Sequence, residues 1–171
     1  GIMDIKELHE RILYPVVRIR TKKAGGSGTI IYSAPNPDDQ EEYQTFIMTC
    51  HHVISDAISY KREFHPVLKR DIKQEFLEKV DVELFDYVYL SKVNSSNSYK
   101  ADIIAYDTSH DIAILMLQTP KRCSHVAKLI PSGKIKEVKL FMPTWTSGCS
   151  LLHDPFANPG YVTYLTDIID N

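Results

Sequence analysis

The sequence has few cysteines and no paired cysteine motif. Its 171 residues contain three cysteines, Cys50, Cys123 and Cys149, which are far apart and form no Cys-x-x-Cys pair. An odd number of isolated cysteines indicates neither a disulfide framework nor a zinc ribbon. We therefore expect the cytoplasm or another reducing compartment, while the start at Gly1 leaves open that a signal segment has been removed.

The sequence also lacks long apolar runs and a strong excess of either charge. No stretch of about 18 apolar residues is present, so we expect no membrane-spanning segment. The formal net charge is -2, and 43% of the residues are hydrophobic, which is ordinary for a soluble protein. A near-neutral chain does not favour a nucleic-acid surface spread over the whole molecule. We expect a near-neutral partner, and neither nucleic acid nor a membrane.

Apolar residues at helical spacing predict two helices. Residues 4–13 carry apolar side chains three or four positions apart, and Asp4 is a possible N-cap. Residues 65–80 carry apolar side chains four positions apart from Leu68 to Val80. We expect a short N-terminal helix in the first segment and an inserted helix in the second.

The rest of the chain is rich in β-branched and aromatic residues in short runs, which predicts an all-β protein. The predicted strands cover residues 16–20, 29–32, 45–49, 82–90, 100–106, 112–117, 138–142 and 160–166. The second and third strands form a hairpin around an exposed loop at 33–42, and turn-forming residues at 94–98 separate the next two strands. Several short strands at regular spacing predict a barrel or a sandwich.

Four short motifs follow one another in an order that is typical of one family. They are Gly26-Ser27-Gly28-Thr29-Ile30-Ile31, Thr49-Cys50-His51-His52-Val53-Ile54, Lys100-Ala101-Asp102-Ile103-Ile104 and Asp111-Ile112-Ala113-Ile114-Leu115. In this order they resemble the trypsin-like serine peptidases, most closely the bacterial high-temperature-requirement branch and its phage relatives. The segments at 148–151 and 159–163 resemble the strands that open the second barrel of that family. Each motif alone is weak, so the order carries the resemblance.

The resemblance implies a fold and a division of the chain. The expected fold is all-β, with a six-stranded antiparallel barrel of the trypsin-like type, the opening strands of a second barrel, the N-terminal helix and the inserted helix. We expect residues 1–120 to form the N-terminal helix and the first barrel. Residues 121–171 are expected to form a linker and an incomplete start of the second barrel.

The resemblance also assigns two catalytic residues, His52 as the general base and Asp111 as the carboxylate that orients it. A serine hydroxyl is a weak nucleophile unless an imidazole accepts its proton, and a carboxylate fixes the imidazole tautomer. Taken alone, His52 would more often bond a backbone carbonyl, and Asp111 would cap a turn. The surrounding motifs reverse that preference. His51 has no role in the family pattern, and we expect it to be a solvated neighbour.

The serine that this family requires is not recognisable in the sequence. The family places it in a Gly-[Asp/Asn]-Ser-Gly-Gly segment whose backbone amides also form the oxyanion hole. The serines after Asp111 all lack that context; they are Ser124, Ser132, Ser147 and Ser150. Cys149 lacks the two following glycines of a cysteine nucleophile and is better interpreted as a buried structural thiol. Cys50, His51, His52, Cys123 and His153 show no zinc-ligand spacing, so we expect neither a metal nor another cofactor.

Three interpretations of the chain follow. The first is the N-terminal part of a serine-type endopeptidase, truncated before its serine and inactive by itself. The second is a catalytically inactive relative that serves as a peptide-binding or assembly module. The third is a cleaved enzyme whose missing C-terminal fragment stays bound. The resemblance implies a protein or peptide substrate, and the unpaired strand edges of a half-built barrel predict self-association.

Overall fold

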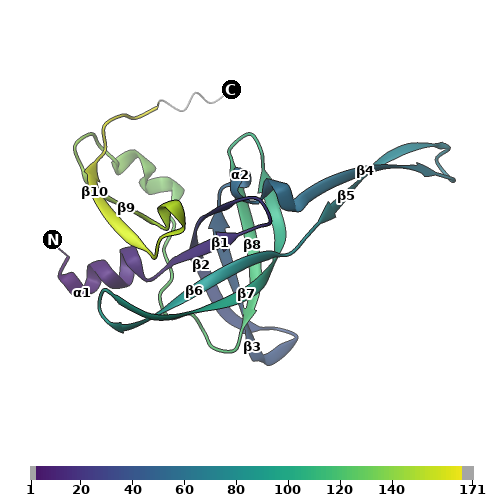
Figure 1. Cartoon of the computed structure of the whole chain (residues 1–171). Helices are drawn as coiled ribbons and strands as arrows, with labels where there is room; N and C mark the ends of the chain where they lie inside the picture. The colour runs from purple at the N-terminus through teal and green to yellow at the C-terminus, as the bar shows by residue number, and fades with distance from the viewer. Residues whose placement is uncertain (1–2, 167–171) are drawn as a thin grey trace.

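The computed structural model describes residues 3–166, and a closed barrel dominates it (Figure 1). The elements in chain order are α1 (Ile5–Leu8), η1 (His9–Leu13), β1 (Val16–Arg20), β2 (Gly25–Asn36), β3 (Asp39–Thr49), α2 (His51–Ile54), η2 (Ser55–Ala57), β4 (Ile58–His65), β5 (Arg70–Leu77), β6 (Val80–Tyr89), β7 (Lys92–Asp107), β8 (Ile112–Thr119), η3 (Ser132–Glu137), β9 (Pro143–Gly148), η4 (Ser150–Leu152) and β10 (Phe156–Tyr161). Across residues 3–166, none of the helices combines the length and the apolar character needed to cross a membrane.

Six antiparallel strands close the barrel in the order β1-β2-β3-β8-β7-β6, and β1 completes it by pairing with both β2 and β6. The predicted all-β fold and its six-stranded barrel are confirmed. Inward-facing residues of neighbouring strands form the core, as where Ile47 of β3 lies opposite Leu115 of β8, both fully buried. Burying a side chain of this size contributes about 1.5–3 kcal/mol, which makes the barrel interior the main source of stability.

Gly28 shows why the Gly-Ser-Gly motif matters to the barrel. A Cβ atom at this position would lie 2.7 Å from side-chain atoms of both Ile19 and Ile47. Those two residues belong to the strands on either side of β2, so only glycine lets the three strands pack this closely. The close packing of β1, β2 and β3 therefore requires glycine at position 28.

The predicted N-terminal helix is present, as α1 continued by the π-helical turn η1. Asp4 is its N-cap, and its carboxylate accepts a hydrogen bond of 2.8 Å from the backbone amide of Glu7. Ser147 of β9 donates a hydrogen bond of 2.7 Å to the carbonyl of Ile12. The helix is thereby joined to the C-terminal part of the chain.

The predicted inserted helix at residues 65–80 is wrong, because this region lies mostly in the hairpin formed by β4 and β5. The hairpin projects away from the barrel as a two-stranded arm (Figure 1). A spacing of four residues fits one face of a helix, but it is also a multiple of the two-residue period of a strand. Ile72 and Phe76 share a strand face for that reason, and Lys69 turns the chain with a positive φ of 52°.

Two predicted connections are also wrong, because polar and turn-forming residues continue the strands there. The predicted loop at 33–42 is mostly strand, with β2 running to Asn36 and β3 starting at Asp39. The predicted turn at 94–98 lies inside β7, where Asn97 donates a hydrogen bond of 2.9 Å to Asp86 of β6. Cross-strand bonds of this kind let turn-forming residues lie in a solvent-facing strand.

The C-terminal part forms a separate two-stranded sheet of β9 and β10. The predicted strand at 138–142 is wrong, since β9 begins at Pro143, and only the first two residues of the predicted strand at 160–166 belong to β10. Phe141 still pairs with Val162 through a backbone hydrogen bond of 2.8 Å. The division of the chain at residue 120 stays a prediction, and residues 1–2 and 167–171 lie outside the described range.

Candidate active site

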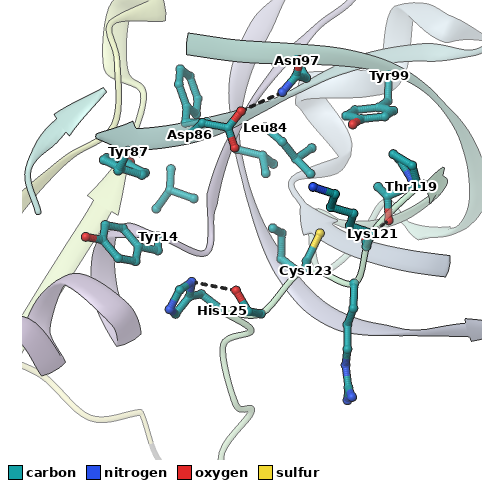
Figure 2. Close-up of a pocket in the computed structure, with 17 residues that line it drawn as sticks. Tyr14, Leu84, Asp86, Tyr87, Asn97, Tyr99, Thr119, Lys121, Cys123 and His125 are labelled. Atoms are coloured by element: carbon teal, nitrogen blue, oxygen red, sulfur yellow. Dashed lines mark hydrogen bonds between the residues drawn. The ribbon is translucent and has the colours of Figure 1, made fainter. Parts of the chain in front are cut away.

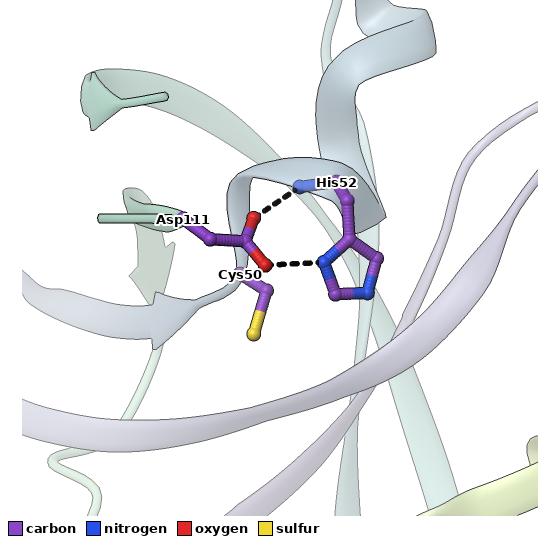
Figure 3. A group of neighbouring side chains, drawn as sticks. All are labelled: Cys50, His52 and Asp111. Atoms are coloured by element: carbon purple, nitrogen blue, oxygen red, sulfur yellow. Dashed lines mark hydrogen bonds and ion pairs between the residues drawn. The ribbon is translucent and has the colours of Figure 1, made fainter. Parts of the chain in front are cut away.

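The strand order brings His52 and Asp111 together although they are 59 residues apart in the sequence. His52 lies in α2, the single turn that follows β3, and Asp111 directly precedes β8. These strands are antiparallel neighbours whose paired residues include Thr49 and Ala113, so the end of β3 meets the start of β8. Both side chains therefore lie at the same end of the barrel (Figure 3).

Two hydrogen bonds join the two residues. The backbone amide of His52 donates to Oδ1 of Asp111 over 2.8 Å, and Nδ1 of the ring lies 2.6 Å from Oδ2. An ionised carboxylate only accepts hydrogen bonds, so this pairing assigns the ring proton to Nδ1 and leaves Nε2 as the acceptor of the neutral ring. The arrangement presents a lone pair on the side of the ring that faces away from Asp111 (Figure 3).

The backbone amide of His52, followed by its ring, lowers the pKa of the Asp111 carboxyl below its usual value. Asp111 also has a φ of 54°, in the left-handed region that aspartate tolerates better than most residues. The side chains of His52 and Asp111 are 71% and 47% exposed, so their attraction adds little to folding stability. The contact is suited to orienting the ring.

Packing against the barrel and a hydrogen bond fix the turn that carries His52. Val53 and Ile54 are buried, and a Cβ atom at Gly26 would lie 2.7 Å from the side chain of Val53. The hydroxyl of Thr49 donates a hydrogen bond of 2.8 Å to the carbonyl of Ser27. The first two sequence motifs therefore meet in space and fix the position of α2.

His51 is half-buried, and the expectation of a solvated neighbour is wrong. Its ring stacks on Tyr106 of β7 with 5.3 Å between centroids and 29° between planes. The hydroxyl of Tyr106 is hydrogen-bonded to Tyr60 of β4 and donates to Glu75 of β5. The arm and the turn that carries His52 are thus connected, a contact that no sequence motif signals.

Two of the serines that follow Asp111 in the sequence are placed by contacts or elements that do not involve His52. Ser147 bonds the carbonyl of Ile12, and Ser150 lies in the short turn η4. Between residues 3 and 166, no hydrogen bond joins Nε2 of His52 to a serine hydroxyl. Cys149 is 1% exposed, and burial raises its thiol pKa to about 11, which confirms the prediction of a buried structural cysteine.

Cys50 was not predicted to take part in a site, yet it lies beside the two predicted residues (Figure 3). One potential ligand atom from each of Cys50, His52 and Asp111 lies within 4.8 Å of the others. Local spacing could reveal only the first two, because the third comes from a distant part of the chain. The structure therefore places a thiol, an imidazole and a carboxylate in one exposed group.

A second histidine–aspartate pair lies nearby in the sequence, but both of its residues come from a single local turn. His110 and Asp107 are joined over 2.7 Å within one turn. Hydrogen bonds from Ser109 and then from His110 lower the pKa of Asp107 to about 2. The side chains of the pair are 74% and 50% exposed, close to the values for His52 and Asp111. The pair is a natural control for that site.

A cavity of about 590 Å³ lies elsewhere on the barrel (Figure 2). Its lining residues come from β1, β2, β6, β7 and the segment after β8, and include neither His52 nor Asp111. Tyr14 donates to the carbonyl of Leu90. The buried hydroxyl of Tyr87 has no hydrogen-bond partner among residues 3–166, and burial raises its pKa. The candidate active site is thus an exposed edge, separate from this cavity.

The closed, six-stranded antiparallel barrel gives the chain an all-β fold of the trypsin-like type. Among solved structures, the chain is similar to the crystal structure of Deg5, with a TM-score of 0.63 and 20% identity over 95% of this chain and 64% of that one. It is also similar to the apo form of the MamO protease domain from Magnetospirillum magneticum, with a TM-score of 0.53 and 16% identity over 89% and 61%.

The sequence comparisons gave no match, either to a protein-family model or to a curated protein. At identities of 20% and 16%, the structural likeness establishes the fold alone. The chain spans less than two thirds of the length of each of these two structures.

Proposed function

We propose that the chain supplies the general base and its orienting carboxylate for a serine-type endopeptidase that acts on proteins or peptides. The observation that carries the proposal is the two-point contact of His52 with Asp111, at 2.8 and 2.6 Å. The fold shared with a structure described as a protease domain supports it further. The contact of Nδ1 with Asp111, which leaves the Nε2 lone pair of His52 free to accept a proton, supports the role of general base.

In the proposed mechanism, Nε2 of His52 accepts the proton of a serine hydroxyl as the hydroxyl attacks the scissile carbonyl. Asp111 holds the Nδ1 proton and stabilises the imidazolium, which then donates its new proton to the leaving amine. We further propose that the serine and the oxyanion hole come from sequence other than residues 3–166. The 171-residue chain alone is then inactive.

A fluorophosphonate probe tests this assignment on the 171-residue chain. Such probes react only with an activated serine, so we expect no labelling of the chain alone. Labelling that disappears in a His52→Ala variant would place the nucleophile within the chain and contradict the proposal. Mass spectrometry of the protein isolated from its native cell adds a second readout, because a bound C-terminal fragment would support the cleaved form of the enzyme.

A second candidate is a catalytically inactive peptide-binding or assembly module. The exposed apolar side chains around β9 and β10, such as Phe141 and Tyr161, favour it. In that case His52→Ala and Asp111→Ala would leave partner binding nearly intact. Under either function we propose a reducing compartment such as the cytoplasm, because Cys50 offers an exposed free thiol.

A further inference from the structure

We propose that Cys50, His52 and Asp111 form a binding site for a borderline-soft divalent cation of the Zn²⁺ type. One ligand atom from each residue lies within 4.8 Å of the others. Figure 3 shows the three side chains side by side, with Nδ1 of His52 directed at the Asp111 carboxylate. Metal binding is a different property from peptide hydrolysis, and it requires no serine.

The chemistry of the donors selects the class of cation. Thiolate, imidazole and carboxylate are the three ligand types that Zn²⁺ takes in proteins. Ca²⁺ and Mg²⁺ prefer sites made of oxygen ligands, so a sulfur and a nitrogen among three donors disfavour both. Three protein ligands leave a fourth tetrahedral position for water, which is the pattern of an open zinc site.

The distances require only small side-chain movements. Zinc bonds of about 2.0 Å to nitrogen or oxygen and 2.3 Å to sulfur separate tetrahedral ligands by about 3.2–3.6 Å. The contact of 2.6 Å between Nδ1 and Oδ2 must therefore open slightly, and the thiol must move inward. His52 and Cys50 are both exposed, so rotation of these side chains meets little packing resistance.

The sequence alone does not reveal this site, because the third ligand is far from the other two along the chain. Cys50 and His52 are two residues apart, while Asp111 reaches them only through the pairing of β3 with β8. This geometry revises the expectation from spacing alone, which gave no metal site. The thiol adds a ligand that the pair of His110 and Asp107 does not have.

Metal binding would remove the general base, a consequence that rests on the proposed function. The neutral ring has one proton and one lone pair, so a cation bound to Nδ1 leaves the proton on Nε2. Nε2 then cannot accept a proton from a serine. The Cys50 thiol loses its proton to water when it binds the metal. The cation would therefore act as an inhibitor.

Titration with Co²⁺, a spectroscopic substitute for Zn²⁺, tests the site on the full 171-residue chain under a non-thiol reductant. We expect one Co²⁺ per chain and a near-ultraviolet thiolate-to-cobalt absorption band, both removed by competing Zn²⁺. Cys50→Ser should abolish the band, and His52→Ala or Asp111→Asn should weaken binding by at least about tenfold. His110→Ala, in the control pair, should change neither.

Two outcomes would overturn the proposal. One is the absence of a thiolate band at saturating Co²⁺, and the other is a band that persists in Cys50→Ser. Circular dichroism of each variant shows whether it is folded, and Cys50→Ser replaces an exposed side chain with one of nearly the same size. Because the readout is absorption, Co²⁺ binding by the chain together with a native gene product that fluorophosphonate does not label would contradict the proposed function and leave the metal site standing.

Discussion

At the scale of single residues, the contact between His52 and Asp111 determines which ring nitrogen carries the proton. The carboxylate accepts from Nδ1 over 2.6 Å and from the His52 backbone amide over 2.8 Å. This pairing could be anticipated from the motif order, since the family pattern names both residues. The involvement of Cys50 and the stacking of His51 could not, because they depend on how β3, β7 and β8 are placed relative to one another.

Asp111→Asn should change the tautomer of His52. An amide group can donate to Nδ1, so the ring proton is expected to move to Nε2. Long-range proton–nitrogen NMR correlations on the 171-residue chain, at a pH where the ring is neutral, measure this directly. The signals of His110 serve as the internal reference and should stay unchanged. An unaltered Nδ1-protonated ring in the variant would contradict the orienting role of Asp111.

Glu83 should make folding stability depend on acidic pH. Its carboxylate lies 2.6 Å from Arg18, and the bond from this guanidinium lowers the Glu83 pKa from 4.5 to about 2. A carboxyl with a lowered folded-state pKa stabilises the fold above its unfolded pKa, and this contribution is lost as the pH falls from about 4.5 to about 2.

Glu83→Gln should therefore lower the free energy of unfolding at neutral pH by about 2–3 kcal/mol and flatten its dependence on pH in that window. Urea denaturation at a series of pH values measures both effects. Glu78→Gln is the control, because Glu78 pairs with Lys22 over 3.5 Å at an exposed site and should cost less than about 1 kcal/mol. Equal losses for the two variants would contradict the account.

At the scale of secondary-structure elements, the sequence predicts strands better than it predicts their ends. The β-branched runs mark the six barrel strands, but β2, β3 and β7 all extend into segments that look like loops. The segment 65–80, which contains β5, is predicted to be a helix because its four-residue spacing satisfies both periods. Cross-strand pairing decides between them, and periodicity within one segment does not contain that information.

Tyr106→Phe should loosen the arm while leaving the barrel intact. The substitution removes the hydroxyl that contacts Tyr60 and Glu75 but keeps the ring that stacks on His51. Hydrogen exchange should become faster in β4 and β5 and stay unchanged in β8. Tyr89→Phe, at a 75% exposed position of β6, is the control and should have no effect. Equal exchange in the arm of both variants would refute the connection.

At the scale of the whole molecule, the most exposed apolar side chains lie outside the barrel. Phe141 is 80% exposed beside β9, and Val67 is 83% exposed at the turn of the arm. The motif order predicts a barrel followed by further strands, and the barrel is present. How the C-terminal sheet packs on the barrel is set by contacts such as that of Arg18 with the carbonyl of Leu152, which no sequence pattern reveals.

The chain is expected to self-associate through the surface around β9 and β10. Exposed apolar patches of this kind associate in water because association removes them from solvent. Phe141→Asp should shift the sedimentation profile toward monomer over a concentration series. Val67→Asp, at an equally exposed position on the arm, is the matched control and should leave the profile unchanged. A monodisperse monomer of the unaltered chain would contradict the prediction.

The most direct test of the central claim is fluorophosphonate labelling of the native gene product that contains this chain. We expect labelling of a serine outside residues 3–166, its loss in His52→Ala, and no change in His110→Ala. Asp111→Asn should slow labelling by a factor on the order of 10⁴. Labelling that is absent, or that persists in His52→Ala, would contradict the assignment of His52 as the general base of a serine peptidase.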